Sequence, residues 1–282
     1  MRLASFSHVR RASYGIVQGD HIVDVGKQIG AQYPDLKSLL TAGPDLLEKL
    51  RSQASKLSID EVKFLPVIPN PDKIFCAGLN YRSHVEETGR TESEKPVIFL
   101  RLAASQIGHG QPMIRPTVST QFDYEGELAV VIGKRGRHIS RDKALDYIAG
   151  YSCYNDGSLR DWQRHTSQWT PGKNFPATGA FGPWLVTADE IPDPTKLSLV
   201  TRLNGQTVQG ATVDLLIFSI PEIIEYVSAW SELVPGDVIA TGTPGGVGFK
   251  RNPPLLMKAG DTVEVDISGI GILRNPIEDE KS

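Results

Sequence analysis

Short apolar runs interrupted by glycine and proline constrain the fold of this chain more than any other feature. The 282 residues include 27 glycines and 19 prolines, a combined share of about 16% against the roughly 12% of average proteins. Because both residues end regular elements and supply turns, this pattern favours strands over long helices. Strands are predicted at residues 73–77, 97–101, 127–132, 184–187, 197–203, 237–241 and 262–267. The sequence therefore predicts a β-rich α+β domain over residues 66–282.

The first 65 residues have the pattern of a small N-terminal α/β unit. Three short strands are predicted at residues 2–6, 14–18 and 21–25, with a tight hairpin at Gly19, because glycine adopts positive φ without strain. Leucines at helical spacing follow and are interrupted by Gly43-Pro44: Leu36, Leu39, Leu40, Leu46, Leu47 and Leu50. The three prolines within residues 64–71 suit neither a helix nor a central strand. We therefore predict two domains, residues 1–65 and 66–282.

Two helices and one hairpin turn are predicted within the larger domain. Residues 141–148 and 220–230 have helical patterns, and Ser219 with Glu222 forms a candidate capping box before the second helix. Asn204-Gly205 is a strong turn signal directly after the strand at 197–203.

Charge, hydropathy and cysteine content exclude several classes of protein. With 30 Lys and Arg against 33 Asp and Glu, the net charge is −3, and no basic block predicts nucleic-acid binding. The chain has no run of about 18 apolar residues, so no membrane span is expected, and its start lacks the apolar core of a secretory signal. Two cysteines, Cys76 and Cys153, do not make a disulfide framework. A cytoplasmic location with reduced thiols is the simplest expectation.

Three acidic residues are the first candidates for chemistry. Glu125 and Glu127 stand at the start of an apolar strand, and residues two apart in a strand point to the same face. Two like charges on one face repel each other unless something offsets them, and a hard divalent cation such as Mg²⁺ or Mn²⁺ would do so. Asp156 ends another apolar run and could supply a third carboxylate. The alternatives are a solvated strand end for the two glutamates and a turn for Asn155-Asp156-Gly157.

A histidine and a glutamate three residues apart form the second candidate. On one helical turn, His84 and Glu87 would be neighbours. A carboxylate beside an imidazole fixes its tautomer and raises its basicity, as a general base requires. An incidental pair on an exposed helix is the alternative, and Glu86 is a competing partner.

The glycine-rich segment 241–250 does not match a phosphate-binding loop. We interpret it as a tight turn whose N–H groups face a ligand anion, or as a structural turn. No nucleophile elbow or zinc helix is present. Arg115, Arg160 and Arg164 could pair with a substrate carboxylate, although salt bridges are their more common role. Trp162, Trp169 and Phe175 could line a pocket, although packing in the core is the usual role of aromatic residues.

Taken together, these segments resemble the fumarylacetoacetate hydrolase family over about residues 70–277. The resemblance is carried, in order, by Gly78-Leu79-Asn80-Tyr81 with His84 and Glu87; Asp123-Tyr124-Glu125-Gly126-Glu127 and the strand after it; Gly150-Tyr151 with Asn155-Asp156; Arg160-Asp161 with Gln163; Gly172-Lys173; Pro235-Gly236-Asp237; and Thr241-Gly242-Thr243-Pro244. It implies a mixed β-sandwich or roll with the site at its mouth, usually in a homodimer. The small N-terminal unit is a variable addition in this family.

The resemblance also implies roles for individual residues. Glu125, Glu127 and Asp156 match the ligands of Mg²⁺ or Mn²⁺. His84 and Glu87 match a catalytic dyad on a mobile lid, and Lys173 matches a catalytic, substrate-facing lysine. The substrate-binding set is Gln163, Thr243, Arg101 and Tyr81. Two departures stand out: many members have lysine at the position of Arg101, and the family's Ser-Phe-Asp after Lys173 reads Asn174-Phe175-Pro176 here.

The activity that the resemblance implies is hydrolysis of a C–C bond in a 2,4-diketo acid of the acylpyruvate type. His84 would activate water for attack on the distal carbonyl, while Lys173 and Gln163 would stabilise the oxyanion. The products would be a carboxylic acid and pyruvate or a similar 2-oxo acid. The alternatives are a decarboxylase, isomerase or hydratase of a 2-oxo acid on the same site, and a non-catalytic protein that binds a small molecule. The expected partner is the small 2-oxo or diketo acid, with no nucleic acid or membrane.

Overall fold

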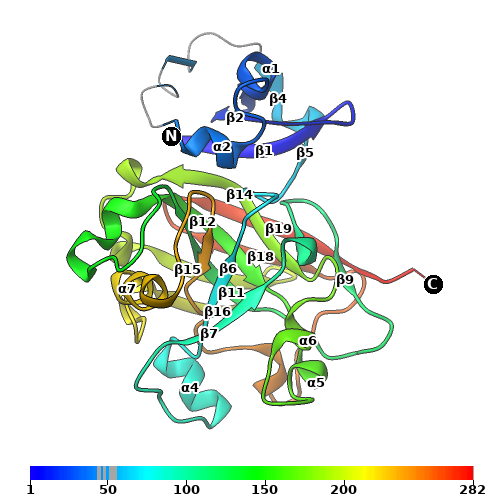
Figure 1. Cartoon of the computed structure of the whole chain (residues 1–282). Coiled ribbons are helices and arrows are strands. Elements are labelled where there is room, and N and C mark those ends of the chain that lie inside the picture. The colour runs from blue at the N-terminus through cyan, green and yellow to red at the C-terminus, as the bar shows by residue number, and fades with distance from the viewer. Residues whose placement is uncertain (43–45, 47–48, 51–55, 282) are drawn as a thin grey trace.

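The computed structural model describes residues 1–42, 46, 49–50 and 56–281, and most of its regular structure is β (Figure 1). Twelve strands form one large mixed sheet. They are β1 (Arg2–His8), β2 (Arg11–Gln18), β3 (His21–Asp24), β4 (Lys56–Ser58), β5 (Lys63–Phe64), β6 (Ile74–Gly78), β7 (Val97–Arg101), β8 (Gln106–Ile107), β11 (Gly126–Ile132), β12 (Ile148–Asp156), β14 (Gly179–Thr187) and β17 (Val238–Ala240).

The order of the large sheet is β4-β3-β2-β1-β14-β12-β11-β17-β6-β7, with β5 paired to β1 and β8 to β14. The N-terminal strands therefore continue the sheet of the larger domain. The junction is an antiparallel pair in which Arg2 lies opposite Val186 and Leu3 opposite Leu185. The boundary at residue 65 stays a prediction, and Gly43-Pro44 and Leu47 of the predicted leucine pattern lie outside the described residues.

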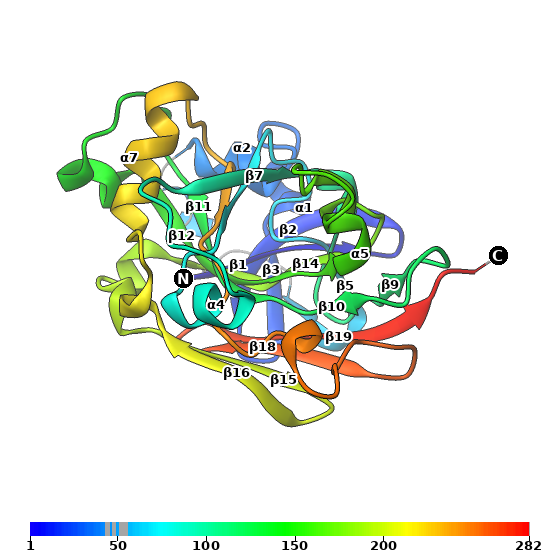
Figure 2. The ribbon, with the colours of Figure 1, turned by 90° about the horizontal axis from the view of Figure 1, so that it is seen from below.

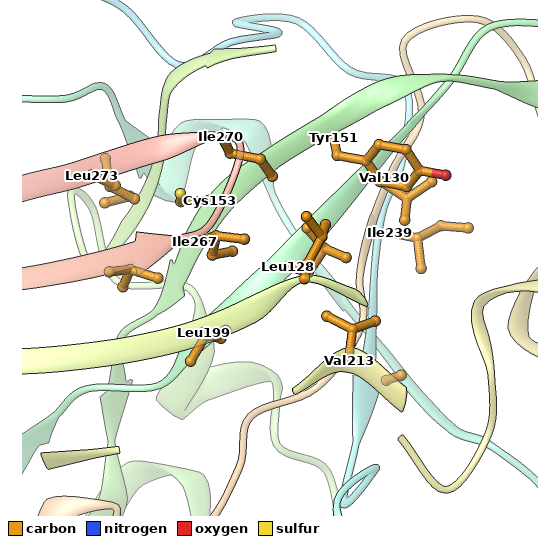
Figure 3. Close-up of a cluster of buried hydrophobic side chains, with 14 of the residues drawn as sticks. Leu128, Val130, Tyr151, Cys153, Leu199, Val213, Ile239, Ile267, Ile270 and Leu273 are labelled. Carbon is orange, nitrogen blue, oxygen red and sulfur yellow. The ribbon is translucent and has the colours of Figure 1, made fainter. Parts of the chain in front are cut away.

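A five-stranded sheet packs against one face of the large sheet. It has the order β16-β15-β18-β19-β9. Its strands are β9 (Met113–Arg115), β15 (Ser198–Leu203), β16 (Gln206–Thr212), β18 (Thr262–Ile267) and β19 (Gly271–Asp279), and β10 (Phe122–Asp123) pairs with β13 (Ser158–Leu159) in a small separate ladder. Figure 3 shows Leu128 of β11 in one cluster of buried side chains with Leu199 of β15 and Ile267 of β18. Alternate residues of β15 are buried, as expected for a strand with one face on the core. The β-rich α+β class is confirmed.

The helices that the structure describes in full are short, apart from α7. They are α1 (Gly26–Ile29), α2 (Leu36–Leu40), α4 (Arg82–Thr88), α5 (Arg160–Gln163), α6 (Thr170–Lys173) and α7 (Ile220–Trp230), with 3₁₀ turns η1 (Ile59–Glu61), η2 (Ala103–Ser105), η3 (Arg141–Tyr147), η4 (Ala188–Glu190), η5 (Pro194–Lys196), η6 (Val213–Leu215) and η7 (Gly248–Lys250). The predicted helix 220–230 and its capping box of Ser219 and Glu222 are confirmed. No described helix has the length and apolar character needed to cross a membrane.

Some elements differ from the sequence prediction. Residues 141–148 were predicted to form a helix, but the segment is the 3₁₀ helix η3, and Ile148 already belongs to β12. Strands β12, β16 and β19 were not predicted. β12 contains Gly150, Ser152 and Asn155, residues with weak or low strand preference, and its burial between β11 and β14 overrides that preference.

The topology places the ends of several elements at one end of the large sheet. β11 and β12 are antiparallel neighbours, with Gly126 opposite Asn155, so the start of β11 adjoins the end of β12. Helices α4, α5 and α6 lie at this end, far from the N-terminal strands (Figure 1), and Figure 2 looks onto it.

Asn80 forms hydrogen bonds that connect three segments at this end of the sheet. It is 1% exposed, its Nδ2 donates to the carbonyls of Phe218 (3.0 Å) and Thr241 (2.8 Å), and its Oδ1 accepts from the Phe218 N–H at 2.8 Å. Asn80→Ala leaves these buried groups without partners, so we expect a loss of roughly 2–4 kcal/mol in the free energy of unfolding. Chemical denaturation measures it. Exposed Asn70, whose Nδ2 donates to Asp35, is the control; equal small losses in both alanine variants would contradict the prediction.

Candidate active site

Three carboxylates meet where β11 starts and β12 ends. One oxygen from each of Glu125, Glu127 and Asp156 lies within 4.8 Å of the others, and all three residues are buried. The alternation along β11 and the pairing of β11 with β12 bring them together. The three acids therefore lie close together, as predicted. Because all three are buried, the two glutamates are not a solvated strand end, and Asp156 is not part of an exposed turn.

The chemistry of this donor set fits a hard divalent cation. Glu127 accepts a hydrogen bond from the Gly242 N–H at 2.8 Å, and it forms no ion pair with the residues that the structure describes. Burial and the charges of Asp156 and Glu125 raise the pKa of Glu127 well above its usual value. Three clustered carboxylate oxygens are the ligands that Mg²⁺ and Mn²⁺ prefer, and a bound cation would offset this repulsion.

Lys173 supplies a positive charge inside the acidic cluster. Its Nζ lies 2.5 Å from Oε2 of Glu125 and 2.6 Å from Oδ2 of Asp156. Burial alone would lower the pKa of Lys173, but these two carboxylates raise it above its usual value. The ammonium group therefore holds two of the candidate ligands in place, in addition to facing the cavity.

Arg160 forms the salt bridges expected as its more common role, and they lie inside the site. Its Nε donates to Asp123 at 2.9 Å, and its Nη1 contacts Oε1 of Glu125 at 2.7 Å and Oε1 of Gln163 at 2.9 Å. Its buried Nη2 has no hydrogen-bond partner among the described residues. Burial would raise the pKa of Glu125, but Arg160, Lys173 and His84 outweigh it and hold that pKa below its usual value. The two N–H donors of Nη2 in Arg160 are thus left for a ligand.

Asp123 anchors Arg160 to the glycine-rich segment. The carboxylate of Asp123 is fully buried and accepts hydrogen bonds from the N–H groups of Gly248 (2.8 Å) and Phe249 (3.1 Å) in η7. The Asp-Tyr-Glu-Gly-Glu motif therefore serves two purposes. Its first residue orients Arg160, and its two glutamates join the acidic cluster.

The histidine–glutamate pair is present on α4. Nδ1 of His84 lies 2.7 Å from Oε1 of Glu87, and His84 is 6% exposed, so this is not an incidental pair on an exposed helix. The other carboxylate oxygen of Glu87 accepts from the Gly246 N–H at 2.7 Å. Glu87, not Glu86, is the partner. A carboxylate on Nδ1 places the proton there and leaves Nε2 as the basic nitrogen.

A cavity of about 150 Å³ joins these groups. It is smaller than the roughly 300–1,000 Å³ of pockets for drug-sized ligands. Most of the predicted site residues line it: His84, Glu125, Glu127, Asp156, Gln163, Lys173 and Thr243. Of the three aromatic candidates, Trp169 lines the cavity, whereas Trp162 and Phe175 pack against the hydrophobic core.

Two predicted substrate-binding residues do not line the cavity. Arg101 ends β7 with its side chain fully buried; it pairs with Asp156 and donates to Thr178 Oγ1 at 2.9 Å. Tyr81 is buried directly before α4 and forms a β-bridge with Leu216. In this structure Arg101 supports a candidate ligand from behind, and Tyr81 belongs to the packing under α4. A role of either residue in binding substrate stays a prediction.

The glycine-rich segment binds carboxylates of the protein itself. The N–H groups of Gly242 and Gly246 donate to Glu127 and Glu87. The Thr243 hydroxyl donates to the Gly126 carbonyl at 2.9 Å and accepts from Gln209 at 2.8 Å. The segment therefore orients the acids of the site, and the Thr243 hydroxyl proton is already engaged.

Further cavity residues were not given a role from the sequence, among them Arg90, Phe249 and Lys250. Arg90 directly follows the C-cap of α4, and the other two lie in η7. Their proximity to the predicted dyad and to the glycine-rich segment was the available signal.

Comparisons with known proteins find relatives over most of the chain. The family model of the fumarylacetoacetate (FAA) hydrolase C-terminal domain matches residues 73–278. The mitochondrial oxaloacetate tautomerase Fahd2a of Rattus norvegicus is 36% identical over 286 residues, 98% of this chain and 91% of the relative.

Solved structures resemble the whole chain. The 5-carboxymethyl-2-hydroxymuconate delta-isomerase of Mycobacterium smegmatis is 32% identical with a TM-score of 0.79, and the match covers 100% of both chains. The maleylpyruvate hydrolase of Sphingobium sp. SYK-6, in complex with manganese(II) and pyruvate, is 29% identical with a TM-score of 0.83 and the same coverage. These relatives are enzymes of different reaction types, a tautomerase, an isomerase and a hydrolase.

Proposed function

Because this chain belongs to the fumarylacetoacetate hydrolase family, we propose that it is a divalent-metal-dependent enzyme that acts on a small 2-oxo acid. The observation that carries the proposal is that one small cavity is lined by His84, which pairs with Glu87, and by three clustered carboxylates. A basic imidazole beside a cation site can take a proton from the carbon next to a carbonyl.

Glu125, Glu127 and Asp156 are the residues that would hold Mg²⁺ or Mn²⁺. Bound there, the cation would polarise the carboxylate and 2-oxo oxygens of the substrate as a Lewis acid. Lys173 and Arg101 hold Asp156 from two sides, and Arg160 holds Glu125. These contacts fix the ligands before substrate arrives, which supports a rigid site.

Proton transfer is assigned to His84. Nε2 takes a proton from the carbon adjacent to the 2-oxo group, and Glu87 stabilises the imidazolium that forms. The free Nη2 of Arg160 and the ammonium of Lys173 lie beside the cavity to stabilise negative charge on the substrate oxygen. Return of the proton to that oxygen completes a keto–enol conversion.

Keto–enol tautomerisation of a compact 2-oxo acid is the reaction we favour. The rat relative with this activity covers nearly the whole chain, and the cavity of about 150 Å³ suits a compact substrate.

Hydrolysis of a C–C bond in an acylpyruvate-type acid is the second candidate. The likeness to a maleylpyruvate hydrolase that binds manganese and pyruvate supports it. In that reaction His84 Nε2 would take its proton from water, and the products would be a carboxylic acid and pyruvate or a similar 2-oxo acid.

Incubation of the Mn²⁺-loaded protein with oxaloacetate and, separately, with an acylpyruvate distinguishes these reactions. We expect faster interconversion of the keto and enol forms of oxaloacetate, followed by enol absorbance, with the rate lost in chelator. Release of acid and pyruvate from the acylpyruvate would instead support the hydrolase, and CO₂ from oxaloacetate a decarboxylase. Metal binding without any turnover would contradict the enzyme proposal and leave a binding protein.

A further inference from the structure

The mouth of the cavity carries positive charge that no acidic side chain balances. Arg90, Arg164 and Lys250 line the cavity and are exposed. Nε of Arg164 donates to the Arg160 carbonyl (2.9 Å) and its Nη2 to Gln121 Oε1 (3.0 Å), while Nζ of Lys250 donates to the Thr88 carbonyl at 3.3 Å. These acceptors are all uncharged. None of the three cations pairs with a carboxylate among the residues that the structure describes.

The Phe249 ring contacts cations both at the mouth of the cavity and in its interior. The Phe249 ring lies 4.5 Å from the guanidinium carbon of Arg160, 5.6 Å from that of Arg164 and 5.4 Å from Lys250 Nζ. Arg90 lies 5.6 Å from the centroid of the Trp169 ring, and both residues line the cavity. The aromatic faces hold these cations close together although they repel one another.

The charge balance of the whole cavity points to an anionic ligand with more than one charge. Five cationic side chains line it, namely Arg90, Arg160, Arg164, Lys173 and Lys250, against the three carboxylates of the acidic cluster. The lining therefore has an excess of two positive charges in a chain whose net charge is −3. A divalent cation on the cluster would increase that excess further.

We propose that Arg164 and Lys250, together with Arg90 of the same cavity lining, form a distal anion subsite that binds a second carboxylate of the substrate. This assignment rests on the proposed function, which places the 2-oxo acid end at the acidic cluster. Arg164 is held at Nε and Nη2, so its Nη1 remains to bind an oxygen, and Lys250 adds a point charge. The small cavity suits a compact carboxylate, so the substrate class is a short 2-oxo dicarboxylic acid.

Matched ligands test the subsite on the full-length, Mn²⁺-loaded protein. Oxaloacetate and 2-oxobutyrate have the same number of carbons but differ in the distal carboxylate, as do 2-oxoglutarate and 2-oxopentanoate. Calorimetric titration at low salt gives the Kd of each. We expect the diacid of at least one pair to bind on the order of 10–100-fold more tightly than its monoacid, as for a charge-assisted hydrogen bond, with the preference falling at high salt.

Variants assign the preference to named residues. Arg164→Gln and Lys250→Gln should each remove most of it while the Kd of 2-oxobutyrate stays within a factor of about two, and Arg164→Lys and Lys250→Arg should restore part of it. Lys196→Gln is the control. Lys196 is an exposed lysine of η5, so this substitution also removes one positive charge, but at a position that does not line the cavity. Monoacid and diacid binding equally, or a preference that survives both glutamine variants, would overturn the subsite alone. If no 2-oxo acid binds, the proposed function fails with it.

Discussion

Glu127→Gln is expected to abolish binding of Mg²⁺ or Mn²⁺ while leaving the metal-free protein at least as stable as the wild type. The substitution keeps the size of the side chain and an oxygen that can accept from the Gly242 N–H. It removes one of three clustered negative charges, and Glu127 is the one whose pKa burial and the other two acids raise. The negative charge of Glu127 attracts a divalent cation. In the metal-free protein, loss of this charge reduces the repulsion among the three carboxylates.

Thermal unfolding with and without Mn²⁺ measures this effect. A ligand at 100 times its Kd stabilises the folded state by about 2.7 kcal/mol, so the wild-type melting temperature should rise with Mn²⁺ while that of the variant stays constant. Glu264→Gln provides the control, because Glu264 lies in β18 and pairs with Arg274. The same Mn²⁺-induced rise in Glu127→Gln as in the wild type would show that the acidic cluster is not the metal site.

His84→Asn is expected to lower kcat by roughly 10²–10⁴-fold, the usual contribution of a general base, while metal binding is retained. The asparagine amide can still donate to Glu87, but it has no basic nitrogen. Glu87→Gln should cause a smaller loss, since the imidazole remains and only its orientation and the stabilisation of its charge are weakened.

Steady-state kinetics at saturating Mn²⁺ test the dyad. His138→Asn is the matched control: His138 is exposed and has a φ of 53°, which asparagine adopts readily. If His84→Asn retains kcat within a few-fold of the wild type, His84 is not the base, and proton transfer must be assigned to another cavity residue.

Local spacing explains which parts of the site the sequence predicted. Glu127 is the second residue of β11 and Glu125 directly precedes this strand, while His84 and Glu87 are three apart on α4. The local backbone geometry therefore brings each pair together. Gly19 likewise predicts its hairpin, since Gln18 pairs with His21 across a two-residue turn.

Contacts between residues far apart in the sequence could not be predicted from local spacing. Lys173 reaches Glu125 across 48 positions, and Asp123 reaches the Gly248 N–H across 125. Such pairs depend on the order of strands in the sheet, which hydrophobic patterns do not determine. The position of Arg101 could not be predicted for the same reason. The sequence shows its charge, but its burial behind Asp156 depends on the place of β7 at the sheet edge. The homodimer implied by the family resemblance stays a prediction.

The pairing of β1 with β14 matters for anyone who shortens this chain. A fragment that starts at residue 73 would retain every candidate site residue, yet it would lose the strand that covers Leu185 and Val186 of β14. Those backbone groups would then form an open edge that recruits strands from other molecules. We therefore expect the N-terminal strands to protect this edge of the large sheet from aggregation, at the end of the molecule opposite the candidate active site (Figure 1).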